Sequence, residues 1–405
     1  MRAPPAVPPS AQPVDPEFAP LPAPFSLVAG GPLFQLLRRS HLSDNSLHLL
    51  QRRVICITLI AWLPLLVLAV AEGRALPGSV DVPFLLDIEA QVRFLVVLPL
   101  LIAAEWLAHR RMSLWIAQFT ERGLVPPAGM QQFQHAIASA MRWRNSVAVE
   151  LALLAVVVLA GASLVPHHFA ADEGTTWRQA DGGLSAAGLW LRAVAMPLVQ
   201  FLILRWYFRL AVWTRFLWQV SRIDLDLLPT HPDGAGGLGF LAALLDGFAA
   251  VIVAHATLLS ARIAQQIFYA EATLPEFVPE IGLLTALVML VFLGPLMLFV
   301  PQLARTQRVG LAQYGSLASR YVREFDLKWV HGRTDPGEPL VGSADIQSLA
   351  DLAGSYDIVR GMRVALVSTT SVLRLLLYTL VPFLPLLLTM MPLDELLKSL
   401  VKLLL

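Results

Sequence analysis

Seven long apolar segments decide what this chain can fold into. They lie near residues 54–72, 91–108, 147–166, 186–208, 238–262, 281–301 and 368–390. The hydrocarbon core of a bilayer is about 30 Å thick, so a helix needs roughly 20 residues to cross it. Inside lipid, a helix also pairs its own backbone N–H and C=O groups. The segments therefore predict an all-α integral membrane protein, a bundle of about seven transmembrane helices.

The composition supports a membrane location. Hydrophobic residues make up 56% of the 405-residue chain and charged residues 15%, whereas about 25% of the residues of a soluble domain are charged. A formal net charge of +1 does not favour a nucleic-acid-binding protein. The single cysteine, Cys56, excludes an internal disulfide and a paired-cysteine metal site. We expect membrane lipids as partners, and neither nucleic acid nor a cofactor.

The basic residues of the loops predict how the chain crosses the membrane. Short cytoplasmic loops of membrane proteins carry an excess of Lys and Arg. Arginines cluster before the first predicted span, between the second and third, after the fourth and after the sixth, while the alternate loops hold acids. Every loop agrees with an amino terminus in the cytoplasm and a carboxyl terminus on the outer, periplasmic side.

The segments around the spans are also predicted from composition and periodicity. A proline-rich stretch predicts a disordered tail, and short basic amphipathic stretches predict helices on the membrane surface. Ser343 predicts the N-cap of a cytoplasmic helix. The chain thus divides into a disordered tail (1–31), an interfacial amphipathic segment (32–53), six spans (54–305), a small cytoplasmic helical segment (306–361), a seventh span (362–391) and an interfacial C-terminal helix (392–405).

Ionisable residues within the spans are candidates for function, because a charge in lipid is costly unless it finds a partner. Three acids and two arginines fall at a similar depth in the cytoplasmic half: Glu105, Glu150, Asp246, Arg205 and Arg374. They favour either a polar cavity that binds a proton or cation, or structural ion pairs, with Glu105 and Arg205 extending to the surface. His255, in the fifth span, either packs through a hydrogen bond or lines a polar path.

The stretch from Arg205 to Leu241 joins the fourth and fifth spans and is the densest in arginine, aromatic and turn residues. Arg205 and Arg209 lie one helical turn apart among tryptophans, which is typical of an interfacial anchor. The GAGGLG block, which contains Gly236 and Gly237, has only the spacing of a dinucleotide-binding motif, because it opens a membrane helix instead of following a strand. Its backbone N–H groups predict an anion site for a lipid phosphate or an anionic substrate.

The turn before these glycines contains His231 and Asp233. With Asp224 and Asp226 it has the residue types of a metal site, but no second histidine lies nearby in the sequence. We therefore favour a turn in which Asp233 caps the next helix, and expect no metal. Residues 167–173, with two histidines and two acids, indicate weak zinc binding at most. The chain lacks the motifs of serine hydrolases, zinc proteases and P-loop enzymes, and we expect no enzymatic activity.

Several stretches resemble a family of bacterial multi-pass inner-membrane proteins. They are RRVICITLIAWLPLLVLAV, DIEAQVRFLVVLPLLIAAE, SRIDLDLLPTHPDGAGGLGFL and SADIQSLADLAGSYDIVRGMR, and the HPD-x-x-GGLGFL block within the third is the most specific. The resemblance implies a helical protein of the inner membrane of Gram-negative bacteria. It implies no activity.

Two functions of different classes fit these observations. The first is a transporter or channel-like protein for a small anion or protonatable solute, with a cytoplasmic site formed by Arg205, Arg209, the glycine block and Asp246. The second is a non-transporting partner or sensor protein that binds lipid headgroups, or another membrane or cytoplasmic protein through residues 306–361. An intramembrane lipid-modifying enzyme is a third alternative. The oligomeric state is left open.

Overall fold

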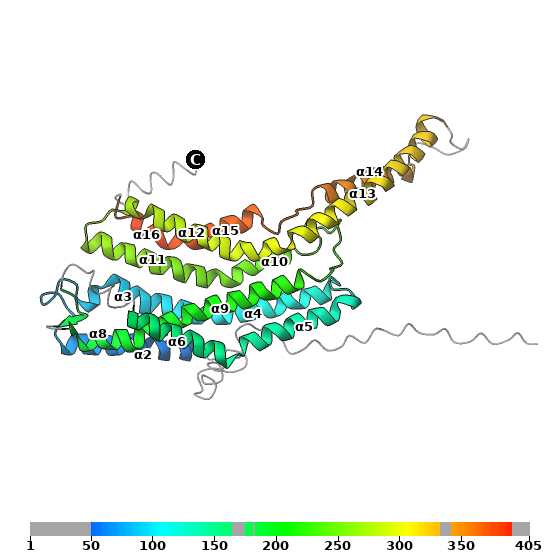
Figure 1. The fold of residues 1–405 in the computed structure, drawn as a ribbon. Coiled ribbons are helices and arrows are strands. Elements are labelled where there is room, and N and C mark those ends of the chain that lie inside the picture. Colours follow the sequence, from blue (N-terminus) through cyan, green and yellow to red (C-terminus); the bar gives the residue numbers. More distant parts are fainter. Residues whose placement is uncertain (1–49, 164–174, 181–182, 333–341, 391–405) are drawn as a thin grey trace, which may run out of the picture.

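A computed structural model describes residues 50–163, 175–180, 183–332 and 342–390 of the chain. These residues are almost entirely helical (Figure 1). Two short strands, β1 (Gln179–Ala180) and β2 (Gly183–Leu184), form an antiparallel pair. The predicted tail, most of the interfacial segment and the predicted C-terminal helix lie outside the described residues.

The helices have the following bounds. The α-helices are α2 (Leu50–Ala71), α3 (Ile88–Val92), α4 (Leu98–Glu121), α5 (Pro127–Arg144), α6 (Val147–Ser163), α8 (Ala186–Trp190), α9 (Met196–Val220), α10 (Phe240–Ala243), α11 (Ala249–Tyr269), α12 (Val278–Leu293), α13 (Val300–Phe325), α14 (Ala344–Arg360), α15 (Thr369–Leu380) and α16 (Leu384–Leu387). Tighter or wider turns join them at η1 (Phe84–Leu86), η2 (Arg93–Val97), η3 (Leu191–Ala195), η4 (Leu244–Phe248), η5 (Leu274–Phe277), η6 (Gly294–Phe299), η7 (Asp326–Val330) and η8 (Val381–Phe383).

Six continuous helices are long and apolar enough to cross a membrane. They are Leu50–Ala71, Ile88–Glu121, Ala186–Val220, Phe240–Tyr269, Leu274–Val330 and Thr369–Leu387. Each corresponds to one of the predicted spans. The predicted span at 147–166 corresponds to α6, whose described apolar part, Val147–Leu159, is shorter than the other six. The prediction of an all-α membrane protein with several spans is therefore confirmed.

Prolines set where two of the spans depart from a regular α-helix. Proline has no N–H to donate, and its ring crowds the preceding turn. The wide, π-type turns η2 and η3 end two residues before Pro99 and Pro197 respectively. Because α4 and α9 begin at these turns, the turns set the direction in which both helices present their charged side chains.

The bundle is organised around α11, which contacts α3 and α4 on one side and α15 on another. Alanines on its buried faces, among them Ala254, Ala256 and Ala261, allow the neighbouring backbones to approach closely. Helix α4 also packs against α2, and α6 packs against α9. Figure 1 shows α2, α6, α8 and α9 in one layer, and α11, α12 and α15 in the other.

Helix α5 lies in the loop between the second and third predicted spans, where no helix was expected. It runs beside α9 at one end of the bundle (Figure 1). Phe133 of α5 packs against Phe119 and Phe216, with ring centroids 5.5 and 6.2 Å apart. This helix lengthens the bundle beyond the apolar segments at the end where the predicted cytoplasmic loops meet.

Beyond the predicted sixth span, the helix continues without a break to Val330 and returns as α14, so that α13 and α14 form a projecting hairpin (Figure 1). Ser343 caps α14 as predicted, accepting a hydrogen bond from the Asp345 N–H at 3.1 Å. The Asp345 carboxylate holds the distal end together, since it accepts from Lys328 Nζ at 2.8 Å and Trp329 Nε1 at 3.0 Å.

Candidate functional site

Glu105 is the centre of a buried ion-pair cluster that joins four helices. Its carboxylate, on α4, lies 2.7 Å from Nη2 of Arg53 on α2 and 2.6 Å from Nη2 of Arg209 on α9. Arg205, also on α9, lies 3.4 Å from Glu105 and 3.5 Å from Glu150 of α6. None of the five residues is more than 9% exposed. Helices α2, α4, α6 and α9 are therefore tied together by charge as well as by apolar packing.

The cluster has an excess of positive charge. Three arginines against two glutamates leave +1 within this group. Neutral groups help to hold the arginines, because the Arg209 guanidinium lies 4.8 Å from the ring centre of Trp206 and Arg53 Nη2 donates to the Ile102 carbonyl at 3.2 Å. The planar arginine fork suits such contacts with several partners. A charge at this depth is tolerated only while it is paired.

Two sequence-based interpretations are wrong for this cluster. The sequence-based division places Arg53 in the interfacial segment, 32–53, but Arg53 lies in α2 and is 2% exposed, facing Glu105. Glu105 and Arg205 do not extend to the surface either, because both are buried in ion pairs. Of the two alternatives for these charges, the structure has the geometry of structural ion pairs.

Asp246 belongs to a different group of side chains. Its carboxylate accepts hydrogen bonds from Arg374 Nη1 at 3.0 Å and Tyr378 Oη at 3.1 Å, and Arg111 Nη1 lies 3.5 Å away. The Arg374 and Arg111 side chains are 48% and 42% exposed, so this group lies at the edge of the bundle. Arg205 and Arg209 pair with glutamates, whereas Asp246 pairs with other arginines. The structure thus places these predicted site residues in two separate groups.

His255 has hydrogen-bond partners of its own. Its Nδ1 lies 2.7 Å from the Val251 carbonyl oxygen, and its Nε2 lies 2.8 Å from Tyr207 Oη. The cavity beside this pair is lined mainly by apolar side chains, such as Ile252 and Val288. Transport of a polar solute past Asp246 and His255 would need a polar lining instead.

Asp233 organises the glycine block through its side chain. The carboxylate accepts hydrogen bonds from the N–H groups of Ala235 at 2.8 Å, Gly237 at 3.1 Å and Gly239 at 2.8 Å. His231 Nδ1 lies 2.9 Å from the same carboxylate. The predicted anion site is thus filled by a carboxylate of the chain itself, and the interpretation of these N–H groups as free is wrong. Asp233 organises the turn that leads into α10, but the N-cap of α10 is Gly239, so the prediction that Asp233 caps the next helix is wrong.

Glycine is required at Gly236 and Gly237 by backbone conformation and by close packing. Their φ angles are +64° and +98°, a region that favours glycine. A Cβ atom at Gly237 would lie 2.7 Å from Leu124 Cδ2, and one at Gly236 would lie 3.1 Å from Met362 Cε. The glycine block therefore packs between the loop after α4 and the residues that follow α14.

The loop from residue 221 to 239 holds the base of the α13–α14 hairpin. Arg363, which follows α14, donates its backbone N–H to the Gly234 carbonyl and its Nη2 to the Asp233 carbonyl, both at 2.8 Å. Gly310 of α13 lies so close to Pro229 that a Cβ atom there would come within 2.8 Å of the proline ring. The base of the hairpin is fixed to the bundle, while the rest projects from it (Figure 1).

The projecting hairpin exposes several large apolar side chains. Val330, at its distal end, is 68% exposed. The exposed apolar residues of the hairpin are Val309, Leu317, Val322, Leu327, Val330, Ile346 and Ile358. Exposed apolar surface beyond a few scattered residues marks interaction sites in folded proteins. These side chains all lie outside the predicted spans, in the segment 306–361.

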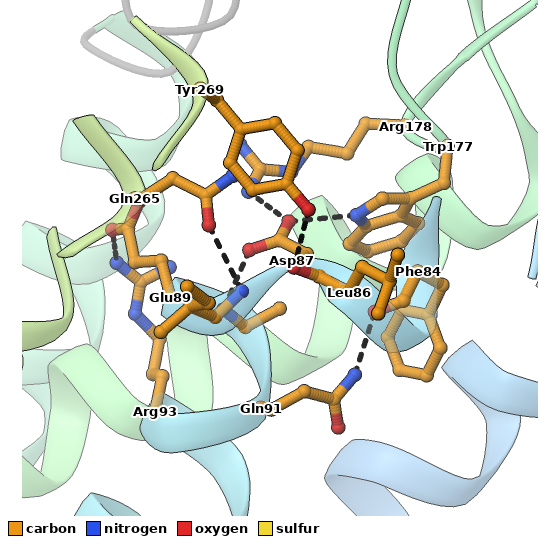
Figure 2. Close-up of polar contacts among 12 residues, drawn as sticks. Phe84, Leu86, Asp87, Glu89, Gln91, Arg93, Trp177, Arg178, Gln265 and Tyr269 are labelled. Atoms are coloured by element: carbon orange, nitrogen blue, oxygen red, sulfur yellow. Dashed lines mark hydrogen bonds and ion pairs between the residues drawn. The ribbon is translucent and has the colours of Figure 1, made fainter. Parts of the chain in front are cut away.

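A third buried carboxylate, Asp87, lies in one of the acid-containing loops that the charge rule assigns to the outer side. It is fully buried, caps α3 through the Ala90 N–H at 2.8 Å, and accepts from Trp177 Nε1 at 2.8 Å. Arg178 forms an ion pair with the same oxygen that binds Trp177. Figure 2 shows Tyr269 of α11 beside this group, where its hydroxyl donates to the Leu86 carbonyl at 3.0 Å. All these partners lie within the protein, so the arrangement is structural.

Neither metal ligation nor similarity to known proteins adds to this picture. In the part of the chain that the structure describes, no three His, Cys, Asp or Glu side chains are grouped so as to hold a metal ion. Comparisons with protein-family models, with curated proteins and with solved structures find no match to this chain. The function must be inferred from the geometry alone.

Replacing Asp233 with alanine is expected to destabilise the protein by about 1–3 kcal/mol at neutral pH, since three backbone N–H groups lose their acceptor. Burial acts to raise the pKa of Asp233, but hydrogen bonds from the Ala235, Gly239 and Gly237 N–H groups outweigh it and keep the pKa below its ordinary value. The stabilisation is therefore complete above the unfolded pKa of about 4 and disappears as the pH falls through the lower, folded pKa.

Thermal unfolding in detergent at several pH values measures this effect. The midpoints of wild type and Asp233→Ala should differ most at neutral pH and converge on acidification. A difference that stayed constant below pH 4 would show that the carboxylate charge has no part in it.

Proposed function

We propose that this protein is a non-transporting, multi-pass protein of the bacterial inner membrane whose α13–α14 hairpin binds another protein in the cytoplasm. The observation that carries the proposal is the hairpin itself, which has a fixed base, a projecting body and exposed apolar side chains such as Val322, Leu327 and Val330. Apolar side chains exposed on an element that projects from the fold are candidates for contact with a partner.

The distribution of basic residues supports the cytoplasmic position of the hairpin. The loop after α4, the loop after α9 and the base of the hairpin contact one another, because Asp226 N–H donates to the Leu124 carbonyl and Arg363 N–H donates to the Gly234 carbonyl. These are the arginine-rich loops that the charge rule assigns to the cytoplasm. With α6 as a further span, the amino terminus is cytoplasmic and the carboxyl terminus periplasmic.

The state of the intramembrane acids supports a non-transporting protein. Glu105 and Glu150 are paired with arginines at a depth where little solvent reaches them. Asp246 is bonded to Arg374 and Tyr378. An acid that binds and releases a transported proton or cation needs access from water, and these pairings instead fix the helices relative to one another.

The docking surface can be tested by site-specific photo-crosslinking in intact cells. With a photoreactive amino acid at position 322 or 327, we expect a discrete protein adduct that is larger than the monomer. The combined substitutions Leu317→Ser and Val330→Ser should reduce its yield at least fivefold, because apolar contacts contribute about 1 kcal/mol or more each when buried. The measurement is the adduct yield, normalised to the amount of protein in the membrane.

A matched control uses polar residues of the same helix. Arg323→Ser together with Glu324→Ser changes two exposed side chains next to Val322, keeps the net charge, and should leave the adduct yield unchanged. Adducts formed equally at all exposed hairpin positions, or none at any, would contradict the docking proposal. Solute flux in proteoliposomes that Asp246→Asn abolishes would restore the transport hypothesis.

A further inference from the structure

A cavity of about 410 Å³ lies between α9, α11 and α12, within three of the helices that are long enough to cross a membrane. Its walls include Leu210 of α9, Ile252 of α11, and Leu287 and Val288 of α12. This volume falls within the range of about 300–1,000 Å³ that is typical of small-molecule sites. The walls are apolar almost throughout, so the cavity suits a hydrocarbon chain and not a hydrated ion.

The cavity reaches the outer surface of the bundle beside α12. Leu287, which lines it, is itself 47% exposed. Leu283 and Leu290, in the adjoining turns of α12, are exposed too. Since α12 belongs to a helix long enough to cross a membrane, we expect a molecule dissolved in the bilayer to reach the cavity beside α12.

One polar group interrupts the apolar lining, namely the pair formed by Tyr207 and His255. The Val251 carbonyl can only accept, so its contact with His255 Nδ1 requires a proton on that nitrogen. The unprotonated Nε2 then accepts from the Tyr207 hydroxyl. The hydroxyl proton is used in this bond, and the Tyr207 oxygen retains a lone pair. The cavity thus presents a hydrogen-bond acceptor beside an apolar chamber.

We propose that this cavity binds a long-chain amphiphile of the membrane whose polar end donates a hydrogen bond to Tyr207 Oη. The hydrocarbon chain lies along Ile252 and Val288, and a hydroxyl or amide N–H at its head meets the tyrosine oxygen. His255 positions the tyrosine hydroxyl by accepting its proton. The site is independent of the hairpin, and it does not rest on the docking proposal.

The chemistry of the head group distinguishes binding at this site from nonspecific contact of lipid with the surface of the bundle. A long-chain alcohol can donate to Tyr207, whereas its methyl ether has the same chain and no proton to give. We expect the alcohol to bind three- to tenfold more tightly than the ether, the factor that one net hydrogen bond supplies. In Tyr207→Phe the alcohol should lose this advantage while the ether binds as before.

Photolabelling of the protein in lipid nanodiscs measures both effects. The probes are hexadecanol with a diazirine in its chain and the methyl ether of the same compound, added at equal mole fractions. Mass spectrometry should locate saturable adducts on the cavity-lining segments of α9, α11 and α12. Unlabelled hexadecanol should compete with the probes and reduce the yield of these adducts.

Two tryptophan substitutions on α12 provide the volume control. Val288→Trp fills the cavity and should remove the saturable adducts, whereas Leu290→Trp adds the same side chain on the exposed face and should leave them. Tyr207→Phe supplies a second variant that keeps the fold. Adducts that persist in Val288→Trp, or equal labelling of wild type by alcohol and ether, would overturn the proposal, because either result describes lipid that only coats the bundle.

Discussion

Replacing Glu105 with glutamine is expected to lower the free energy of unfolding by about 3–5 kcal/mol, the loss found when one partner of a buried ion pair is removed. The wild-type cluster carries three positive and two negative charges, +1 in total, and the variant carries three and one, +2. Arg53 and Arg209 would then remain buried without a carboxylate partner. The thermal midpoint of the detergent-purified protein, and its level in the membrane, should both fall sharply.

The same reasoning predicts a partial rescue. Adding Arg53→Met to Glu105→Gln removes one uncompensated charge and returns the cluster from +2 to +1. The double variant should therefore be more stable than the sum of the single losses implies, with a coupling energy of about 0.5–3 kcal/mol. Glu121→Gln, at the exposed end of the same helix, should change the stability by about 0.5 kcal/mol or less.

These variants also separate the two interpretations of the intramembrane charges. A carboxylate that belongs to a water-filled cavity can become neutral without loss of fold. If Glu105→Gln accumulated normally and unfolded at the wild-type temperature, Glu105 would not be a structural clamp. The cavity interpretation, and with it transport, would then regain support.

Hydropathy predicted the spans well because a membrane helix must be apolar along about 20 residues whatever its neighbours are. Each of the six long helices could be located in this way without knowledge of the fold. Helix α5 was missed because it has only one apolar face, whose partner, Phe216, lies in another helix. Such a helix is defined by the surface against which it packs, and that surface is not visible in local sequence.

Charge partners were the least predictable part of the candidate site. Composition placed Glu105, Glu150 and Arg205 at one depth, and the structure does bring them together. The sequence could not assign Arg53 to this cluster, because Arg53 lies at the margin of its apolar segment. The direction of its side chain depends on where the helix begins and how the helix is rotated. Asp233 filled the predicted anion site for a local reason, since a carboxylate two residues before a run of free N–H groups reaches them first.

Asp87 was not recognised because its partners are far away in the chain. Trp177 and Arg178 lie in the loop before β1, and Gln265 and Tyr269 on α11 complete the surroundings (Figure 2). In sequence, an aspartate before an apolar segment is indistinguishable from a solvated loop acid. Its complete burial and its bonds to Trp177 and Arg178 show that it joins the start of α3 to the loop before β1.

Asp87→Ala is accordingly expected to destabilise the protein by about 3–5 kcal/mol, because the buried ion pair between Asp87 and Arg178 would lose one of its members. The Trp177 N–H and the Ala90 N–H would each lose their acceptor as well. We expect faster hydrogen exchange in the segment around residues 175–180 and at the start of α3, together with a lower thermal midpoint. The Glu105 cluster shares no residue with this site, so its helices should keep their protection against hydrogen exchange.

Asp87→Asn separates charge from hydrogen bonding at this site. The amide retains an oxygen that can accept from Trp177 or from Ala90, but it carries no charge to pair with Arg178. The stability of Asp87→Asn should therefore lie between the stabilities of wild type and Asp87→Ala. Asp81→Asn changes an exposed carboxylate of the same loop, bonded to Thr175, and should have a much smaller effect. If Asp87→Asn matched wild type, the ion pair with Arg178 would contribute nothing, and the hydrogen bonds alone would account for the burial of this aspartate.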